Sequence, residues 1–357
     1  MTPDDVRAGS LAGLGAFFVV GIAFWETGQE RETRRWSRPG EDTVEDGSEG
    51  HYGPDPPRPS PLSGAEDSPR IFRIDDAFSL MKIGIDLGRR TISVGWVEDR
   101  AVRVIHDAPT PDAADDVLAC LDDLLSRVPM GQATSIGVAV PGPVDGEAGV
   151  VRTLPSVSSW TDVPLADRLT VCHDVPAAVQ RDANCFALAE ACYGSGQGVS
   201  PMVGLVLNEG IGGGVVVDGT LLTGCTFSAG AFGAAPYKDG RYEHYCAGQF
   251  IERAYDTTVQ EALERAEDGD EDARAMFATM GTHLGRAVQS VLAAVDPACI
   301  VMGGALRHAH PYFEDAMWDE LEAFSSPQAL ETLSVQLSQL KRPAVLGAAA
   351  LGSMEAA

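Results

Sequence analysis

Three short stretches of the sequence combine residue types that could carry out phosphate chemistry. Asp86-Leu87-Gly88-Arg89-Arg90-Thr91 and Asn208-Glu209-Gly210-Ile211-Gly212-Gly213-Gly214 are glycine-containing turns that each follow an apolar run. Because glycine has no Cβ, the backbone N–H groups of such turns can approach a phosphate closely. Between them lies Arg181-Asp182-Ala183-Asn184. An aspartate there could accept the proton of a hydroxyl group that attacks a phosphate.

Each of these patterns also has a purely structural explanation. A glycine turn on its own is more often a tight hairpin, and Asp182 could instead cap the helix that follows it. The two turns lie about 120 residues apart, each between two expected strands. This repetition resembles the duplicated lobes of the actin/hexokinase architecture, in which one β-hairpin from each lobe holds the nucleotide phosphates.

The elements that would position these residues alternate between strand and helix patterns, which predicts an α/β fold. Short apolar runs bounded by glycine or proline predict strands, and apolar residues at helical spacing predict helices. We expect strands at 82–85, 91–97, 135–140, 202–207, 215–217 and 299–302, and an apolar segment at 175–180. We expect helices at 112–128, 183–193 and 271–295.

Several motifs along this pattern resemble, in order, the ROK (repressor, open reading frame, kinase) family. They cover most of the chain from Met81 onward. The family motifs are G-P-V-D … G-V-V … W-x-x-V-P-L, then G-I-G-G-G-x-x-x-D-G-x-L, then D-P-x-x-I-V-x-G-G. The segments similar to them are Val138–Asp145, Gly149–Val151, Trp160–Leu165, Gly210–Leu222 and Asp296–Gly304.

The resemblance implies a two-lobed actin-like/hexokinase (ribonuclease H-like) ATPase fold and a homodimer. It also implies a kinase that transfers the γ-phosphate of Mg-ATP to a hexose or related sugar. Asp182 resembles the family's general base, and Asp86 resembles the aspartate that orients Mg²⁺ and phosphates. Glu243 lies in a segment similar to L-E-x-Y-x-S-G, whose Glu binds sugar hydroxyls. The implied nucleotide- and phosphate-binding residues are Asp86, Gly88, Gly210, Gly212, Gly213, Gly214, Gly303 and Gly304, and the implied sugar-binding residues are Gly142, Ser156, Asn184 and Glu243.

Both phosphate turns depart from the family pattern. Arg89 and Arg90 replace the second Gly and the Thr of D-x-G-G-T. Their guanidinium groups could still bind phosphate, although the side chains obstruct a close backbone approach. Glu209 stands where Thr usually precedes G-I-G-G-G. A carboxylate beside a triphosphate is repulsive by on the order of 1–4 kcal/mol.

The sugar-binding region also departs from the family. In the segment similar to A-G-E-x-G-H, Ala231 and Ala234 replace the Glu and the His, and Arg181 replaces the Asn before the catalytic Asp. Because hydrogen bonds to a hydroxyl decide specificity, the choice of sugar cannot be carried over. The zinc module C-x-C-G-x-x-G-C is absent, since 239–245 runs directly into Cys246. We therefore expect no structural zinc.

These departures leave two functions open. Asp182 and the intact Gly212–Gly214 favour a sugar kinase that depends on ATP and Mg²⁺. The missing sugar contacts favour a catalytically degenerate relative, which would bind a sugar, sugar phosphate or nucleotide and act as a regulatory protein.

Residues 1–80 differ in composition from the rest of the chain. Residues 8–25 are uncharged and mostly apolar, at the lower limit for a membrane-spanning helix. Residues 41–70 have the composition of a disordered linker. The segment is either a weak membrane anchor or the product of a misassigned start, with the natural start at Met81. We expect 1–80 to be a poorly ordered extension, 81–190 with 340–357 to form the N-terminal lobe, and 191–339 to form the C-terminal lobe.

The amino-acid composition limits which binding partners and which cellular compartment we expect. The net charge of −26 argues against nucleic acid, which requires clustered basic residues, and we expect no membrane partner either. Lys82, Lys238 and Lys341 are the only lysines. Such an acidic, lysine-poor chain is typical of a salt-adapted cytosolic protein, with an ordinary acidic enzyme as the alternative. The seven cysteines form no C-x-C or C-x-x-C pair, which indicates free thiols in the reducing cytoplasm.

Overall fold

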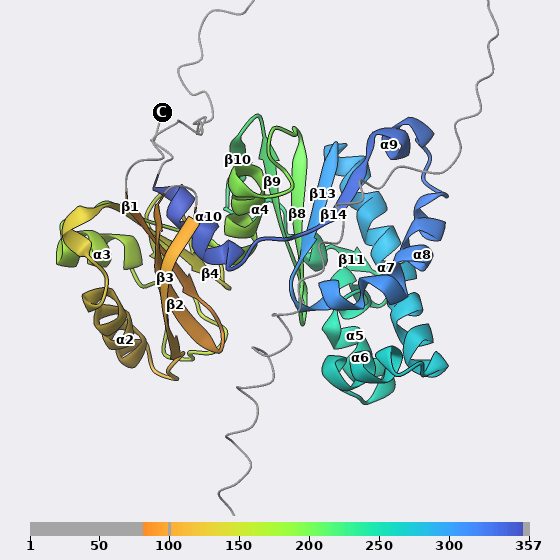
Figure 1. Cartoon of the computed structure of the whole chain (residues 1–357), viewed down its shortest axis with the longest axis horizontal. Coiled ribbons are helices and arrows are strands. Elements are labelled where there is room, and N and C mark those ends of the chain that lie inside the picture. Colours follow the sequence, from red (N-terminus) through yellow and green to blue (C-terminus); the bar gives the residue numbers. More distant parts are fainter. Residues whose placement is uncertain (1–80, 99–100, 353–357) are drawn as a thin grey trace, which may run out of the picture. The chain divides into compact units, whose positions relative to one another are not determined.

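The computed structural model describes residues 81–98 and 101–352 of the chain. The candidate membrane segment at 8–25 and the linker at 41–70 lie outside the described residues. Within the described ranges, no helix has both the length and the apolar character that crossing a membrane requires. The described residues fall in one compact unit of the chain, and its helices pack around two β-sheets (Figure 1).

The first sheet consists of β1 (Met81–Leu87), β2 (Thr91–Glu98), β3 (Ala101–Pro109), β4 (Ala133–Val140) and β7 (Ala177–Arg181). Its strand order is β3-β2-β1-β4-β7. The first three strands pair antiparallel, whereas β4 and β7 continue the sheet in parallel to β1. Both β1 and β4 are buried along most of their length. Helices cover both faces, which explains why these strands are continuous apolar runs.

The second sheet repeats this topology. It consists of β8 (Met202–Leu207), β9 (Ile211–Val217), β10 (Thr220–Leu222), β13 (Cys299–Gly303) and β14 (Ser334–Leu337), in the order β10-β9-β8-β13-β14. Again β8, β9 and β10 pair antiparallel to their neighbours, whereas β13 and β14 continue the sheet in parallel to β8. The two equivalent sheets confirm the predicted α/β, actin-like/hexokinase fold.

One strand begins earlier than the sequence indicated. We expected 211–214 to belong to a turn and the strand to begin at 215, but Gly212, Gly213 and Gly214 pair in register with β8. Glycine is a poor strand former, so its low β-propensity suggested a turn. The structure shows that small residues are needed here, because helix α4 (Asp182–Tyr193) packs directly on Gly212 and Gly214, and the Gly230 carbonyl lies against Gly213.

The C-terminal helix α10 (Pro343–Leu351) covers one face of the first sheet. It approaches the strands closely because Gly84 and Gly137 have no side chain. A Cβ on Gly137 would lie 1.7 Å from the carbonyl oxygen of Ala348, and one on Gly84 would lie 2.0 Å from that of Val345. The apolar residues at alternate positions of these strands face the opposite side, where α2 (Ala114–Ser126) and α3 (Leu165–His173) complete the core.

Helix α4 (Asp182–Tyr193) connects the two sheets (Figure 1). On one side it packs on β8 and β9, where a Cβ on Gly214 would lie 2.8 Å from that of Ala187. On the other side it contacts α10, where a Cβ on Gly347 would lie 1.7 Å from the carbonyl oxygen of Cys185. These close contacts hold α4 in position between the two sheets, and Asp182 is the first residue of this helix.

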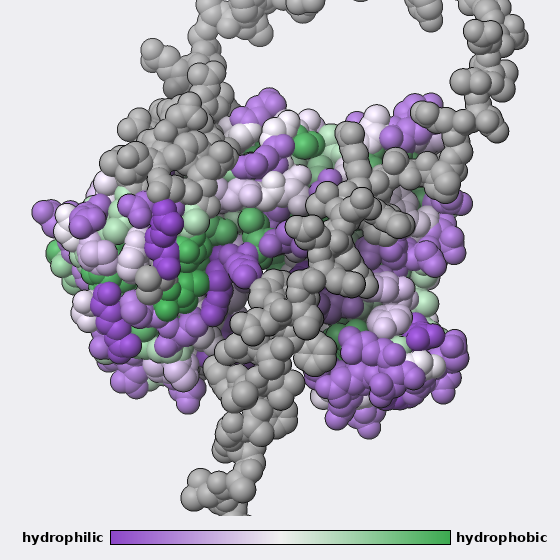
Figure 2. All heavy atoms as spheres, in the orientation of Figure 1, coloured by the Kyte–Doolittle hydropathy of each residue, from purple (hydrophilic) through white to green (hydrophobic). Residues whose placement is uncertain are grey.

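The remaining helices pack with the second sheet around a second core. They are α5 (Gly248–Tyr255), α6 (Val259–Glu267), α7 (Glu271–Val295), α8 (His310–Leu321) and α9 (Pro327–Thr332). Helix α7 has the bounds expected from the sequence, because Asp270 caps its N-terminus and Asp296 ends it in a left-handed conformation. The visible surface over α5 and α6 is mostly hydrophilic (Figure 2).

Shorter elements occupy the connections. They are β5 (Val144–Asp145), β6 (Val150–Val151), β11 (Pro236–Tyr237), β12 (Gly240–Arg241) and the 3₁₀ helices η1 (Met130–Gln132), η2 (Phe232–Ala234), η3 (Tyr242–His244) and η4 (Ala305–Ala309).

Candidate active site

Three of the predicted site residues lie at one edge of the first sheet. Asp86 is opposite Ala139 in the parallel pair of β1 and β4, and Val140 is opposite Arg181 in the pair of β4 and β7. Because parallel strands end at the same edge, Asp86 near the end of β1 lies there with Gly142 and Asp182, which follow the ends of β4 and β7. Ligand sites in α/β folds commonly form at this edge.

Asp182 is the first residue of α4, and its Oδ1 accepts a hydrogen bond of 2.7 Å from the N–H of Ala183. Burial raises the pKa of Asp182, while this hydrogen bond and the charge of Arg181 oppose the rise. A carboxylate with a raised pKa is a better proton acceptor near neutral pH than an ordinary aspartate.

Asp86 lies within electrostatic range of Asp182. Burial, followed by the negative charge of Asp182, raises the pKa of Asp86 to about 7, although Arg342 opposes the rise. The thiol of Cys185 on α4 also has a raised pKa because of burial and the charges of both carboxylates. A desolvated carboxylate whose pKa is raised further by a second buried carboxylate is typical of a functional site.

The carboxylate of Asp86 fits a magnesium ion. Mg²⁺ prefers carboxylate oxygens, and in phosphate sites it is commonly held by one or two carboxylates together with phosphate oxygens. Its charge would also relieve the repulsion between Asp86 and Asp182. In 81–98 and 101–352, no group of three or more His, Cys, Asp and Glu side chains could hold a metal ion. Phosphate oxygens would therefore have to complete the coordination of the ion.

The first glycine turn joins β1 to β2. The N–H of Gly88 donates to the carbonyl of Thr91 at 3.0 Å, and the Gly88 carbonyl accepts from Oγ1 of Thr110 at 2.7 Å. A Cβ on Gly88 would lie 2.8 Å from the Thr91 carbonyl oxygen, which explains the glycine. Since the Gly88 N–H is used within the turn, it is not a free donor for a phosphate.

The second turn, between β8 and β9, contacts the loop after β13. Oδ1 of Asn208 accepts from the N–H of Ala305 at 2.7 Å. Gly304 has a φ of 88°, and a Cβ there would lie 2.3 Å from the carbonyl oxygen of Leu207. The structure therefore brings the predicted Gly303-Gly304 loop beside the second turn. Asn208 was not among the predicted site residues, although its position between a strand and a glycine was the available signal.

The glycines of β9 have a packing role. Gly212 and Gly214 face α4, where a Cβ on either would lie 2.8 Å from the Cβ of an alanine. Gly213 faces the opposite side, and a Cβ there would lie 2.5 Å from the carbonyl oxygen of Gly230. Close packing thus accounts for all three glycines, and their contact with phosphate stays a prediction.

The charged residues that depart from the family pattern contact one another across the two turns. Nη1 of Arg89 lies 2.9 Å from Oε2 of Glu209, and Nη2 of Arg90 lies 3.5 Å from Oε1. The side chains of Arg89 and Glu209 are about half exposed, at 55% and 49%. Exposed pairs of this kind contribute only ~0–1 kcal/mol to stability. The contact therefore adds little to the stability of the fold. Its main effect is that the Glu209 carboxylate neutralises positive charge on Arg89 and Arg90 between the two turns.

Arg181 connects the strand before Asp182 to the second sheet. Its Nη1 donates to the carbonyls of Phe227 and Ala229 at 3.4 and 3.3 Å, and its Nη2 donates to that of Gly213 at 3.3 Å. Burial lowers the pKa of this guanidinium. The side chain that replaces the family's Asn thus holds the segment in which the sugar-binding Glu and His are missing.

The predicted sugar-binding residues are not all brought together. Glu243 lies against the second turn, since a Cβ on Gly210 would lie 2.9 Å from its Oε2. Gly142 is next to Thr153, the carbonyl oxygen of which would lie 2.1 Å from a Cβ on Gly142. Ser156 follows this segment closely in sequence and is partly buried.

Asn184, the fourth predicted sugar-binding residue, faces the interior. Its side chain is fully buried, and Nδ2 donates to Oε1 of Gln180 at 3.0 Å. Among the described residues, Oδ1 of Asn184 has no hydrogen-bond partner.

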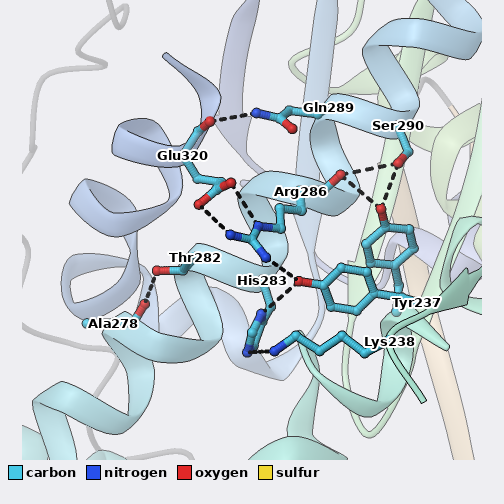
Figure 3. A network of polar contacts seen from close by, with 10 residues as sticks. Tyr237, Lys238, Ala278, Thr282, His283, Arg286, Gln289, Ser290 and Glu320 are labelled. Atoms are coloured by element: carbon cyan, nitrogen blue, oxygen red, sulfur yellow. Dashed lines mark hydrogen bonds and ion pairs between the residues drawn. The ribbon is translucent and has the colours of Figure 1, made fainter. Parts of the chain in front are cut away.

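A polar network, which we call the His283 network, holds the loop that leads to Glu243 (Figure 3). Nδ1 of His283 lies 3.0 Å from the hydroxyl of Tyr237, and Nζ of Lys238 lies 3.4 Å from Nε2. Arg286 donates to the Tyr237 hydroxyl at 3.3 Å and to Glu320 at 2.8 Å. This network ties β11 to α7 and α8, in the region where the family has its zinc module.

Comparisons with known proteins agree with this fold and site. The duplicated sheets define a protein of the actin-like/hexokinase class. The model of the ROK family matches residues 82–355, and the chain belongs to the ROK family.

Its relatives include both enzymes and a repressor. The chain is 29% identical over 307 residues to a glucokinase of Thermotoga maritima, covering 76% of this chain and 97% of that protein. It is 24% identical over 289 residues to the DNA-binding transcriptional repressor Mlc of Escherichia coli, covering 71% of each. Among solved structures, the ROK hexokinase of Thermus thermophilus matches with a TM-score of 0.67 and 26% identity, covering 76% of this chain and 97% of that one.

Proposed function

We propose that this protein is a sugar kinase that transfers the γ-phosphate of Mg-ATP to a hydroxyl of a hexose or related sugar. The observation that carries the proposal is the meeting of Asp86 and Asp182 at one sheet edge, each with a raised pKa. Membership of a family that includes glucokinases supports it.

In this reaction Asp182 accepts the proton of the attacking sugar hydroxyl. The hydroxyl oxygen bonds to the γ-phosphorus, and the bond from that phosphorus to the β–γ bridging oxygen breaks, so ADP leaves with the electron pair. Asp86 would hold Mg²⁺ together with the phosphate oxygens, and the ion would neutralise charge on the phosphates. We place Gly88 and Gly210 beside the phosphates, Gly303 and Gly304 beside the adenosine, and Glu243 at the sugar.

The test is phosphorylation of a hexose and amino-sugar panel by the purified protein, in molar KCl with Mg-ATP. The matched control is Asp182→Asn, which keeps the size of the side chain but removes the base. We expect turnover to fall by ~10²–10⁴-fold in this variant. An unchanged melting temperature would show that the variant is folded, and undiminished turnover would rule out Asp182 as the base.

A second candidate function is a regulatory protein that binds a sugar, sugar phosphate or nucleotide without turnover. The replacement of two polar sugar contacts by Ala231 and Ala234 favours it, and the repressor relative makes it relevant. A folded protein that phosphorylates no sugar of the panel, but melts at a higher temperature with one of these ligands, would favour this function.

The remaining expectations stay predictions. We propose a cytoplasmic homodimer that binds neither nucleic acid nor zinc. Light scattering would report the mass in solution, and metal analysis of the purified protein would report any bound zinc.

A further inference from the structure

The two turns proposed to hold the donor phosphates carry opposite charges that contact each other. The contact joins the β1–β2 turn to the β8–β9 turn, at 2.9 Å for Arg89 and 3.5 Å for Arg90. Glu209 therefore presents its carboxylate to both guanidinium groups. Arginine binds carboxylate and phosphate oxygens with the same geometry, so each of these groups could equally hold a phosphate.

Two donors that the family's first turn offers to a phosphate are changed in this chain. The Gly88 N–H is used inside the turn, and the family's Thr hydroxyl is absent because Arg90 occupies its position. The side chains of Arg89 and Arg90 are 55% and 89% exposed, so a ligand can reach them.

We infer that Arg89 and Arg90 bind the phosphate chain of the donor, and that Glu209 occupies their guanidinium groups until the donor replaces it. The inference rests on the proposed function, because it concerns the donor of that reaction. It names the shared chemistry of the ligand, a polyphosphate chain. Both a nucleoside triphosphate and an inorganic polyphosphate supply such a chain.

The inference gives Arg89 and Glu209 opposite effects on donor affinity. Removing the Glu209 carboxylate frees the arginines and removes a repulsive charge, so the donor should bind more tightly. Removing the Arg89 guanidinium should weaken binding. If the ion pair only held the two turns in place, either substitution would break it and both would change the affinity in the same direction.

The experiment measures dissociation constants by calorimetry for the full-length protein with Mg-ATP, Mg-tripolyphosphate and adenosine. For Glu209→Gln we expect roughly 3–10-fold tighter binding of the two polyphosphates, and for Arg89→Gln roughly 5–10-fold weaker binding. The double variant should bind more tightly than Arg89→Gln but more weakly than Glu209→Gln, because Arg90 is freed and the repulsive charge is removed while the Arg89 guanidinium is still missing. Adenosine has no phosphate, so its affinity should not change.

The matched control is Asp123→Asn on α2. Its carboxylate pairs with Arg127, and the two side chains are 60% and 51% exposed, similar to Glu209 and Arg89. This variant should leave every affinity unchanged. An equal effect on Mg-ATP and Mg-tripolyphosphate would mean that the phosphate chain alone is recognised. Tightening with Mg-ATP alone would assign the site to nucleotides.

The outcomes separate this inference from the proposed function. If both single variants weaken binding, or neither changes it, the inference is wrong even when sugars are phosphorylated. If the affinities change as expected but no sugar is phosphorylated, the inference holds and the kinase proposal fails. If the unaltered protein binds neither polyphosphate, both are wrong.

Discussion

The His283 network should make the protein sensitive to acid. His283 is 8% exposed, and burial, followed by the charges of Lys238 and Arg286, lowers its pKa from 6.5 to about 4. The ammonium of Lys238 can only donate, so Nε2 accepts from it and Nδ1 carries the proton toward Tyr237. Protonation would place a second N–H against the Lys238 ammonium, which explains why the neutral ring is favoured.

The size of the effect follows from the two pKa values. Below pH 6.5 the unfolded chain binds a proton at this position, whereas the folded protein binds it only near pH 4. The free energy of unfolding therefore falls as the pH is lowered through this window. The difference between the two pKa values corresponds to a loss of about 3 kcal/mol in the free energy of unfolding. Above pH 6.5 the ring is neutral in both states and contributes no pH dependence.

We would measure urea unfolding at several pH values from 7.5 to 4, at constant salt, for the unaltered protein and for His283→Gln. Gln cannot titrate but can still form hydrogen bonds. Buried carboxyls such as Asp86, with its raised pKa, affect both curves and cancel in the difference. We expect the stability of the unaltered protein to fall by about 3 kcal/mol more than that of the variant.

Parallel curves would refute this reasoning. So would an NMR titration of the His283 ring with a midpoint near 6.5. A Lys238→Met variant gives an independent check, because removing the ammonium should raise the midpoint of His283.

Two further predictions concern stability alone. Gly347→Ala should lower the free energy of unfolding by about 3 kcal/mol or more, because the added Cβ would lie 1.7 Å from the Cys185 carbonyl oxygen. Gly131→Ala is the control, since it has open space around it, and an equal loss in both variants would contradict the packing argument. Thr258→Ala should cost about 1 kcal/mol in urea unfolding, because Thr258 and Glu261 form the capping box of α6. No change in stability would mean that this cap contributes nothing.

Much of the fold was readable from local sequence signals. Apolar runs marked the most buried strands, and apolar residues at helical spacing predicted α7 with its observed bounds, Glu271–Val295. The sequence analysis did not predict β3, β10, β14, α3, α5, α6, α8, α9 or α10, and it predicted β9 too short. The sequence could not show that Gly212–Gly214 form part of a strand. The reason for these glycines lies outside the strand, since α4 packs on Gly212 and Gly214 and the carbonyl of Gly230 lies against Gly213.

Some features of the candidate site could likewise be predicted from the sequence, whereas others depend on the tertiary structure. Asp86 and Asp182 could be selected from the sequence because each stands at a strand end within a recognisable motif. The electrostatic effect of Asp182 on Asp86, and the pKa of about 7 at Asp86, depend on the register of β1, β4 and β7. The interior position of Asn184 likewise could not be read locally, because it depends on which side of α4 faces β9.

The sequence by itself determined the fold class, the positions of the turns and the candidate base, because these depend on residues close together in the chain. Only the tertiary structure decided which charges meet. Arg89 and Glu209 each looked like an isolated loss from a phosphate turn, yet they pair across 120 residues. Such contacts depend on how the two sheets are held by α4 and α10, and no local pattern of side chains encodes that arrangement.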